Sequence, residues 1–132
     1  PSVSALSLHA ALPICQPTGY IRRYLLRPDG FISINAPYAG GEMVTKPLTF
    51  QGAALELNFA TSAAGGIRVE IQDADGAPIE GYTLGDSAEI IGNMLERTVL
   101  WNGNGDVSAL AGRPVRLRFA MKDADLYAIQ FK

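Results

Sequence analysis

The chain is poor in the two side chains that most often supply nucleophilic chemistry or covalent cross-links. Its 132 residues include one cysteine, Cys15, and one histidine, His9. A single cysteine cannot form a disulfide within the chain, so the cysteine count does not indicate a redox compartment. A serine or cysteine nucleophile needs a neighbouring base, and His9 is the one histidine that could act as one. We therefore expect no catalytic centre of this kind.

The chain also lacks an excess of one charge and a long hydrophobic run. Eleven basic residues stand against thirteen acidic ones, and the basic residues are scattered. Because no basic patch could follow a phosphate backbone, we expect no nucleic-acid partner. No apolar run approaches the roughly 20 residues of a membrane-spanning helix, so we expect a soluble domain without membrane contact. The length predicts one domain with its own core.

Residues 1–15, PSVSALSLHAALPIC, contain no glycine and no charged residue. Three interpretations are open. The segment could end a secretory signal, although a basic start and a clear cleavage site are missing. It could also be a short native helix. Alternatively, ALSLHAALPI resembles TLSLHDALPI, a peptide translated from a common sequencing-adapter oligonucleotide. We favour this third interpretation, which predicts a non-native or disordered leader over residues 1–15, a native domain over residues 16–132, and no chemistry at His9.

From residue 20 onward, apolar and polar side chains alternate. Ile67, Val69 and Ile71 alternate with polar residues, and the same two-residue period recurs in residues 54–60 and 114–121. This period is typical of strands with one buried face. The strands predicted in this way span residues 20–26, 30–36, 42–50, 54–60, 67–72, 78–84, 95–101, 114–121 and 126–131. Residues 85–93 are expected to form a loop that could contain one short extended stretch at 89–91, and one helical turn capped by Asp106 is expected at 106–112.

This succession of short strands predicts the fold class. Turn signals such as Arg27-Pro-Asp-Gly30 separate the strands at roughly ten-residue intervals, and no long helix is expected. We predict an all-β fold: an antiparallel β-sandwich of jelly-roll type with eight or nine strands. An open barrel is the alternative.

Two Asp-Ala-Asp tripeptides are the candidate metal site. Asp73 and Asp75 follow one predicted strand, and Asp123 and Asp125 precede another. Carboxylate oxygens suit Ca²⁺, so a structural calcium ion is possible, whereas no other cofactor is expected. The same acids could in principle serve glycoside cleavage. The structural alternative is that each aspartate bonds its own backbone in a turn.

Aromatic residues in predicted loops are the candidate carbohydrate site, because a sugar ring stacks on an exposed aromatic face beside amide groups. The candidates are Trp101, Asn102, Asn104, Tyr82 and Tyr38. Alternatively, Trp101 covers the edge of the core and donates its indole N–H to a loop carbonyl.

Four charged residues at alternate strand positions are expected to pair across the sheet rather than to form a site. They are Arg68, Glu70, Arg116 and Arg118.

From about residue 22 to residue 131 the chain resembles a known module. The matching phrases are RPDGF at 27–31, TKPL at 45–48, IRVEIQDADG at 67–76, EGYTL at 80–84, DVSALAGRPVRLRF at 106–119 and KDADLY at 122–127. They are similar to the C-terminal β-sandwich module of bacterial proteins related to glycoside hydrolase families 32 and 43, whose catalytic carboxylates lie on a five-bladed propeller. Residues 86–87 and 102–105 depart from the module's usual sequence.

The resemblance implies a non-catalytic accessory domain whose partner is a propeller-type catalytic domain, in a secreted or periplasmic protein. Two alternatives remain open. The chain could bind a glycan directly as a carbohydrate-binding module, or it could be a structural domain that self-associates as a homodimer.

Overall fold

The computed structural model describes residues 19–132, in two units that divide after Phe31. The predictions for residues 1–15 and for His9 lie outside the described residues. In the first unit, a turn is closed by the amide of Gly30, which donates to the carbonyl of Arg27 at 3.0 Å. The strand predicted at 20–26 is not formed: Ile21 is fully exposed, and no strand pairs with this segment among residues 19–132. An alternating pattern forms a strand only where a partner satisfies its backbone.

The second unit contains one antiparallel sheet of five strands. The strands are β1 (Ile34–Ala36), β2 (Gly41–Val44), β3 (Leu55–Asp73), β4 (Asn93–Thr98) and β5 (Val115–Phe131), and a single 3₁₀ turn covers Ser108–Leu110. The order is β1-β5-β3-β4, and β2 also pairs with β5. The prediction of an all-β fold is confirmed.

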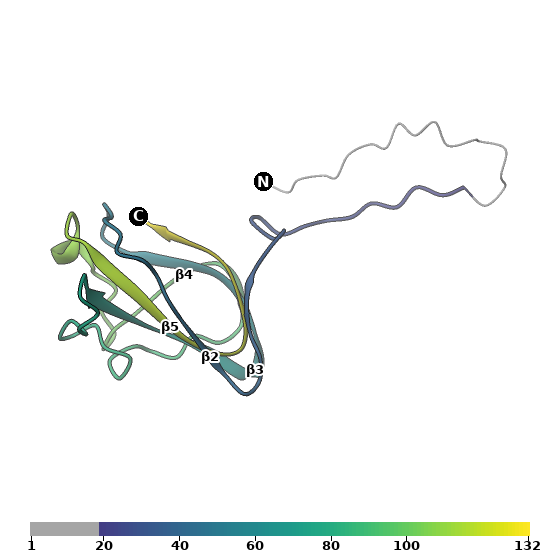
Figure 1. Cartoon of the computed structure of the whole chain (residues 1–132). Coiled ribbons are helices and arrows are strands. Elements are labelled where there is room, and N and C mark those ends of the chain that lie inside the picture. Colours follow the sequence, from purple (N-terminus) through teal and green to yellow (C-terminus); the bar gives the residue numbers. More distant parts are fainter. Residues whose placement is uncertain (1–18) are drawn as a thin grey trace. The chain divides into compact units, whose positions relative to one another are not determined.

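The long antiparallel pair of β3 and β5, the β3–β5 pair, organises this sheet. Its register is interrupted where Thr61 lies opposite Ala124 and Gly66 lies opposite Lys122, so that residues 62–65 on β3 face one residue on β5. That residue, Asp123, has φ +42°. An irregularity of this kind bends both strands, and Figure 1 shows β5 turning back on itself at this point. β1 and β4 flank one half of the bent β3–β5 pair, and β2 flanks the other half.

The bent β3–β5 pair surrounds one continuous core. Along β3 the completely buried residues keep a two-residue period on both sides of the irregularity, from Leu55 to Ile71. Along β5 the period shifts by one residue at Asp123, because the inward positions change from Met121 to Ala124. Because Asp123 shifts the alternation of β5 by one residue, the apolar side chains after the bend again face the core. Residues from both halves of the β3–β5 pair belong to the same buried cluster.

The strand count differs from the expected eight or nine for three reasons, of which the first is the absence of the strand predicted at 20–26. Residues 54–60 and 67–72 are parts of β3, and residues 114–121 and 126–131 are parts of β5, because the predicted loops at 61–66 and 122–125 are irregularities within paired strands. Residues 78–84 and 89–91 form isolated bridges at Pro78 and Ile90 instead of full strands. The helical turn predicted at 106–112 is shorter, a 3₁₀ turn over Ser108–Leu110 with Val107 as its N-cap residue, and the Asp106 carboxylate accepts the amide of Ser108 at 2.8 Å.

Candidate functional site

The loops after β3 and β4 bring together four of the candidate sugar-binding residues. Trp101 is only 2% exposed, and its indole Nε1 donates to the carbonyl of Val69 at 2.8 Å. The ring of Tyr82 meets Trp101 edge to face at 5.4 Å, and the Tyr82 hydroxyl donates to the carbonyl of Asp106. This is the structural alternative for Trp101, because a buried indole has no free face on which a sugar could stack.

The neighbouring asparagines shape the turn after Trp101. Asn102, with φ +49°, donates from Nδ2 to Asp86 at 2.9 Å, and the side-chain oxygen of Asn104 accepts the amide of Asp106. Hydrogen bonds from Asn102, and then from Thr83, lower the pKa of Asp86. Each of these two candidate side-chain amides therefore makes a local hydrogen bond through one of its polar atoms, Nδ2 of Asn102 and Oδ1 of Asn104.

Tyr38, the fifth candidate, belongs to a different part of the surface. It lies in the connection between β1 and β2 and is 64% exposed. The ammonium group of Lys122 lies 4.3 Å from the centre of its ring. Of the five candidates, Tyr38 is the one with a large exposed aromatic surface.

The two Asp-Ala-Asp tripeptides do not meet. Asp73 pairs with Val115 at the start of β5. Asp123 lies eight residues after Val115 along the same strand, about 27 Å away at 3.4 Å per residue. The Asp73 carboxylate accepts the amides of Asp75 and Ala77, each at 2.9 Å.

Asp125 is engaged in a different way, because it accepts hydrogen bonds from Ser33 at 2.7 Å and Asn35 at 3.1 Å and so attaches β1 to β5. Within residues 19–132, no group of three or more histidine, cysteine, aspartate or glutamate side chains could hold a metal ion.

A buried carboxylate lies on the outer face of the sheet, where the sequence predicts charges that pair between strands but not a buried one. Glu70 is 4% exposed. It accepts hydrogen bonds from Gln72 at 2.8 Å, from the amide of Leu84 at 3.1 Å and from Arg118 at 3.4 Å. Of the four charged residues expected to pair across the sheet, Glu70 and Arg118 do so, whereas Arg116 donates to the carbonyl of Ala74. The burial of Glu70 was not predictable from the alternation, because the covering loop around Leu84 is distant along the chain.

The pKa of Glu70 makes stability depend on pH. Burial is the largest single effect and raises this pKa, but the hydrogen bonds from Gln72, Leu84 and Arg118 together outweigh it, so the pKa lies below its ordinary value of 4.5. A carboxyl group whose pKa is lowered by folding stabilises the native state above its unfolded pKa, and this contribution is lost as the pH falls through the folded value. We expect Glu70→Gln to cost about 1 kcal/mol at pH 6 and progressively less below pH 4.5. Urea unfolding across this range measures the difference; with the exposed Glu80→Gln as control, a pH-independent cost would contradict the argument.

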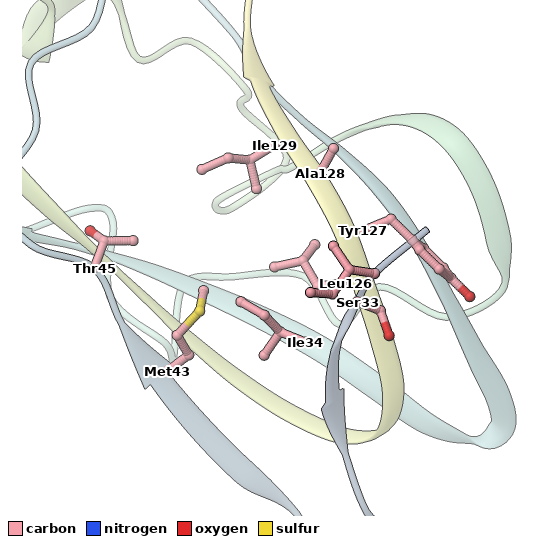
Figure 2. A pocket seen from close by; sticks show the side chains of 9 residues that line it. Ser33, Ile34, Met43, Thr45, Leu126, Tyr127, Ala128 and Ile129 are labelled. Atoms are coloured by element: carbon pink, nitrogen blue, oxygen red, sulfur yellow. The ribbon is translucent and has the colours of Figure 1, made fainter. Parts of the chain in front are cut away.

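An apolar groove of about 410 Å³ lies between β1 and β2. Ile34 comes from β1, Met43 from β2, and Leu126 and Ile129 from β5, and none of the lining side chains is charged. Figure 2 shows the side chains of Ile34, Met43 and Leu126 directed into this space. β1 and β2 each pair only with β5 among residues 19–132, so their outer edges are free. Alternation within 30–36 and 42–50 predicts which side chains share a face, but not that these two edges would enclose a groove.

No helix in the described part of the chain is long and apolar enough to cross a membrane. No family model matches the chain, and neither the curated proteins nor the solved structures contain a significant match to it.

Proposed function

We propose that this chain is a non-catalytic β accessory domain of a carbohydrate-active protein, and that it packs against a neighbouring domain of that protein through the groove between β1 and β2. The observation that carries the proposed docking is the groove itself, whereas the carbohydrate-active context rests on the resemblance of residues 22–131 to the accessory module. The lining of the groove is apolar, and Ile32 and Ile34 on its wall are 79% and 46% exposed. Exposed apolar surface beside free strand edges is typical of a docking surface.

The bent β3–β5 pair supports the finer proposal of a sandwich of jelly-roll type. β3 and β5 each contribute to both halves of the folded sheet, and both halves share one core. Strands that pass from one layer to the other through a bend or bulge are a feature of packed sheets. In such an arrangement β1 and β2 are edges of opposite layers, and a docked domain would cover the opening between them.

Hydrogen exchange tests the docking surface. We expect the amides of β1 and β2 to exchange at least about tenfold more slowly in the longer natural protein than in the isolated chain, because the neighbouring domain covers them. Met43→Asp should abolish this difference, since it places a charge in the apolar groove. Val44→Asp is the matched control, because Val44 is the next residue on β2 and its side chain points away from the groove.

Three outcomes would contradict the proposal. Equal exchange rates in the two proteins would exclude docking at the groove. Hydrolysis of a glycoside by the purified chain would exclude a non-catalytic role. Light scattering at two concentrations that shows a dimer, lost in Met43→Asp, would assign the groove to a second copy.

A further inference from the structure

A second depression lies on the outer face of the sheet, across β3, β5 and β2. Arg68, Ala120 and Glu42 are register partners, so they form one row on the same face. The methyl group of Ala120 separates two long side chains, and Gly66 leaves the next position on β3 without a side chain. The result is a hollow of about 340 Å³ lined by Glu42, Gly66, Arg68, Glu89, Ala120 and Lys122.

Glu89 is held against the floor of this hollow. The segment that carries it is fixed to β3 by two backbone hydrogen bonds between Ile67 and Ile90, each 2.9 Å long. A Cβ atom on Gly66 would lie 2.7 Å from Glu89 Oε1. Glycine at this position therefore makes room for the carboxylate of Glu89.

The charges in the hollow are unequally engaged. Arg118 contacts the two carboxylate oxygens of Glu42 at 2.8 and 2.9 Å and also pairs with Glu70, so Glu42 is already engaged. Among residues 19–132, no ion pair involves Arg68, Lys122 or Glu89. Two cationic groups and one carboxylate are thus available to a ligand, beside the exposed ring of Tyr38 that Lys122 contacts.

We propose that this hollow binds a carboxylate-bearing sugar of the uronic acid type. The sugar carboxylate pairs with Arg68 and Lys122, a hydroxyl group donates to Glu89, and the apolar face of the sugar approaches Tyr38 at the rim. A ligand with negative charges alone would be repelled by Glu89, whereas a neutral sugar would leave both cations without a partner. The hollow and the groove lie on opposite faces of β2, since Glu42 lines one and Met43 lines the other.

Calorimetry on the full chain tests this assignment with an oligogalacturonate tetramer and its methyl ester, which keeps the hydroxyl groups but removes the charge. We expect binding of the acid that weakens with salt, and binding of the ester that is weaker by about tenfold or more. Arg68→Gln should weaken acid binding by about tenfold, whereas Arg97→Gln, which removes the same charge from exposed β4, should not. Ala120→Phe keeps every charge but fills the hollow, and it should also abolish binding.

Equal affinities for acid and ester, equal effects of Arg68→Gln and Arg97→Gln, or no binding of the acid at millimolar concentration would each overturn the assignment. Equal affinity for a glutamate tetrapeptide would also overturn it in favour of an acidic peptide. Near-UV circular dichroism confirms that each variant is folded. Because the groove is not involved, failure here leaves docking unaffected, and loss of docking leaves sugar binding unaffected.

Discussion

Replacement of Trp101 by alanine is expected to remove about 4 kcal/mol of the free energy of unfolding. The indole is the largest buried side chain of the core, and the variant would lose its packing, its edge contact with Tyr82 and its hydrogen bond to Val69. A domain of this size has roughly 5–15 kcal/mol in total, so this loss is a large fraction of its stability. Urea unfolding followed by far-UV circular dichroism measures the change.

Trp101→Phe separates the hydrogen bond from the packing. Among residues 19–132, no strand pairs with the outer edge of β3 at Val69: Ser87 Oγ accepts the Val69 amide at 3.0 Å, and Trp101 Nε1 donates to the Val69 carbonyl at 2.8 Å. Phenylalanine leaves that carbonyl unpaired, which costs about 1–3 kcal/mol. A loss in Trp101→Ala no larger than in the exposed variant Tyr38→Ala would contradict a structural role for Trp101.

The environment of Trp101 shows how far sequence reasoning reached. A tryptophan at the end of an apolar strand and before a glycine-rich turn favours either an exposed sugar platform or a cover for the core. The choice depends on whether another segment crosses the ring. That segment, around Tyr82, is nineteen residues earlier along the chain, and no local pattern predicts such a contact. The turn residues, in contrast, were predictable, because asparagine and glycine tolerate positive φ.

Local rules also identified the strands but not their continuity. The alternation assigns correctly the buried positions of β3 on each side of the bend and those of β5 before it. Residues 61–66 and 122–125 carry the composition of loops, so the sequence predicts breaks there. In the structure these residues remain within the β3–β5 ladder as an irregularity. Whether a polar stretch interrupts a strand or bulges within it is decided by the partner strand, which the sequence does not identify.

The same limitation applies to the groove and the hollow. Each depends on how the strands pair. Ile34 and Met43 line the same groove because β1 and β2 both pair with β5. Arg68, Ala120 and Glu42 form one row only when β3, β5 and β2 have paired. The residue types are visible in the sequence, but their convergence is a property of the register. Consecutive residues of β2 serve the two surfaces, so the proposed docking and sugar binding can occur in the same molecule without competing.

Substitution of Gly65 by alanine is expected to destabilise the domain by about 3 kcal/mol, because it adds a side chain at the bend of the β3–β5 pair. A Cβ atom at Gly65 would overlap the carbonyl oxygen of Lys122 and lie 2.5 Å from the carbonyl oxygen of Asp123. Both obstacles are backbone atoms of β5 and cannot rotate away, so the two strands would have to separate where the ladder changes register. Thermal and urea unfolding of the variant measure the loss.

Gly85→Ala is the matched control, since a Cβ atom there would meet Thr83 Oγ1 at 3.6 Å, an ordinary contact, and Gly85 lies in a loop. This variant should stay within about 1 kcal/mol of the parent. If Gly65→Ala were equally mild, β3 and β5 would not approach closely at the bend. The shared core, the groove and the outer hollow would then require another arrangement of the two halves, because all three depend on the bend of the β3–β5 pair.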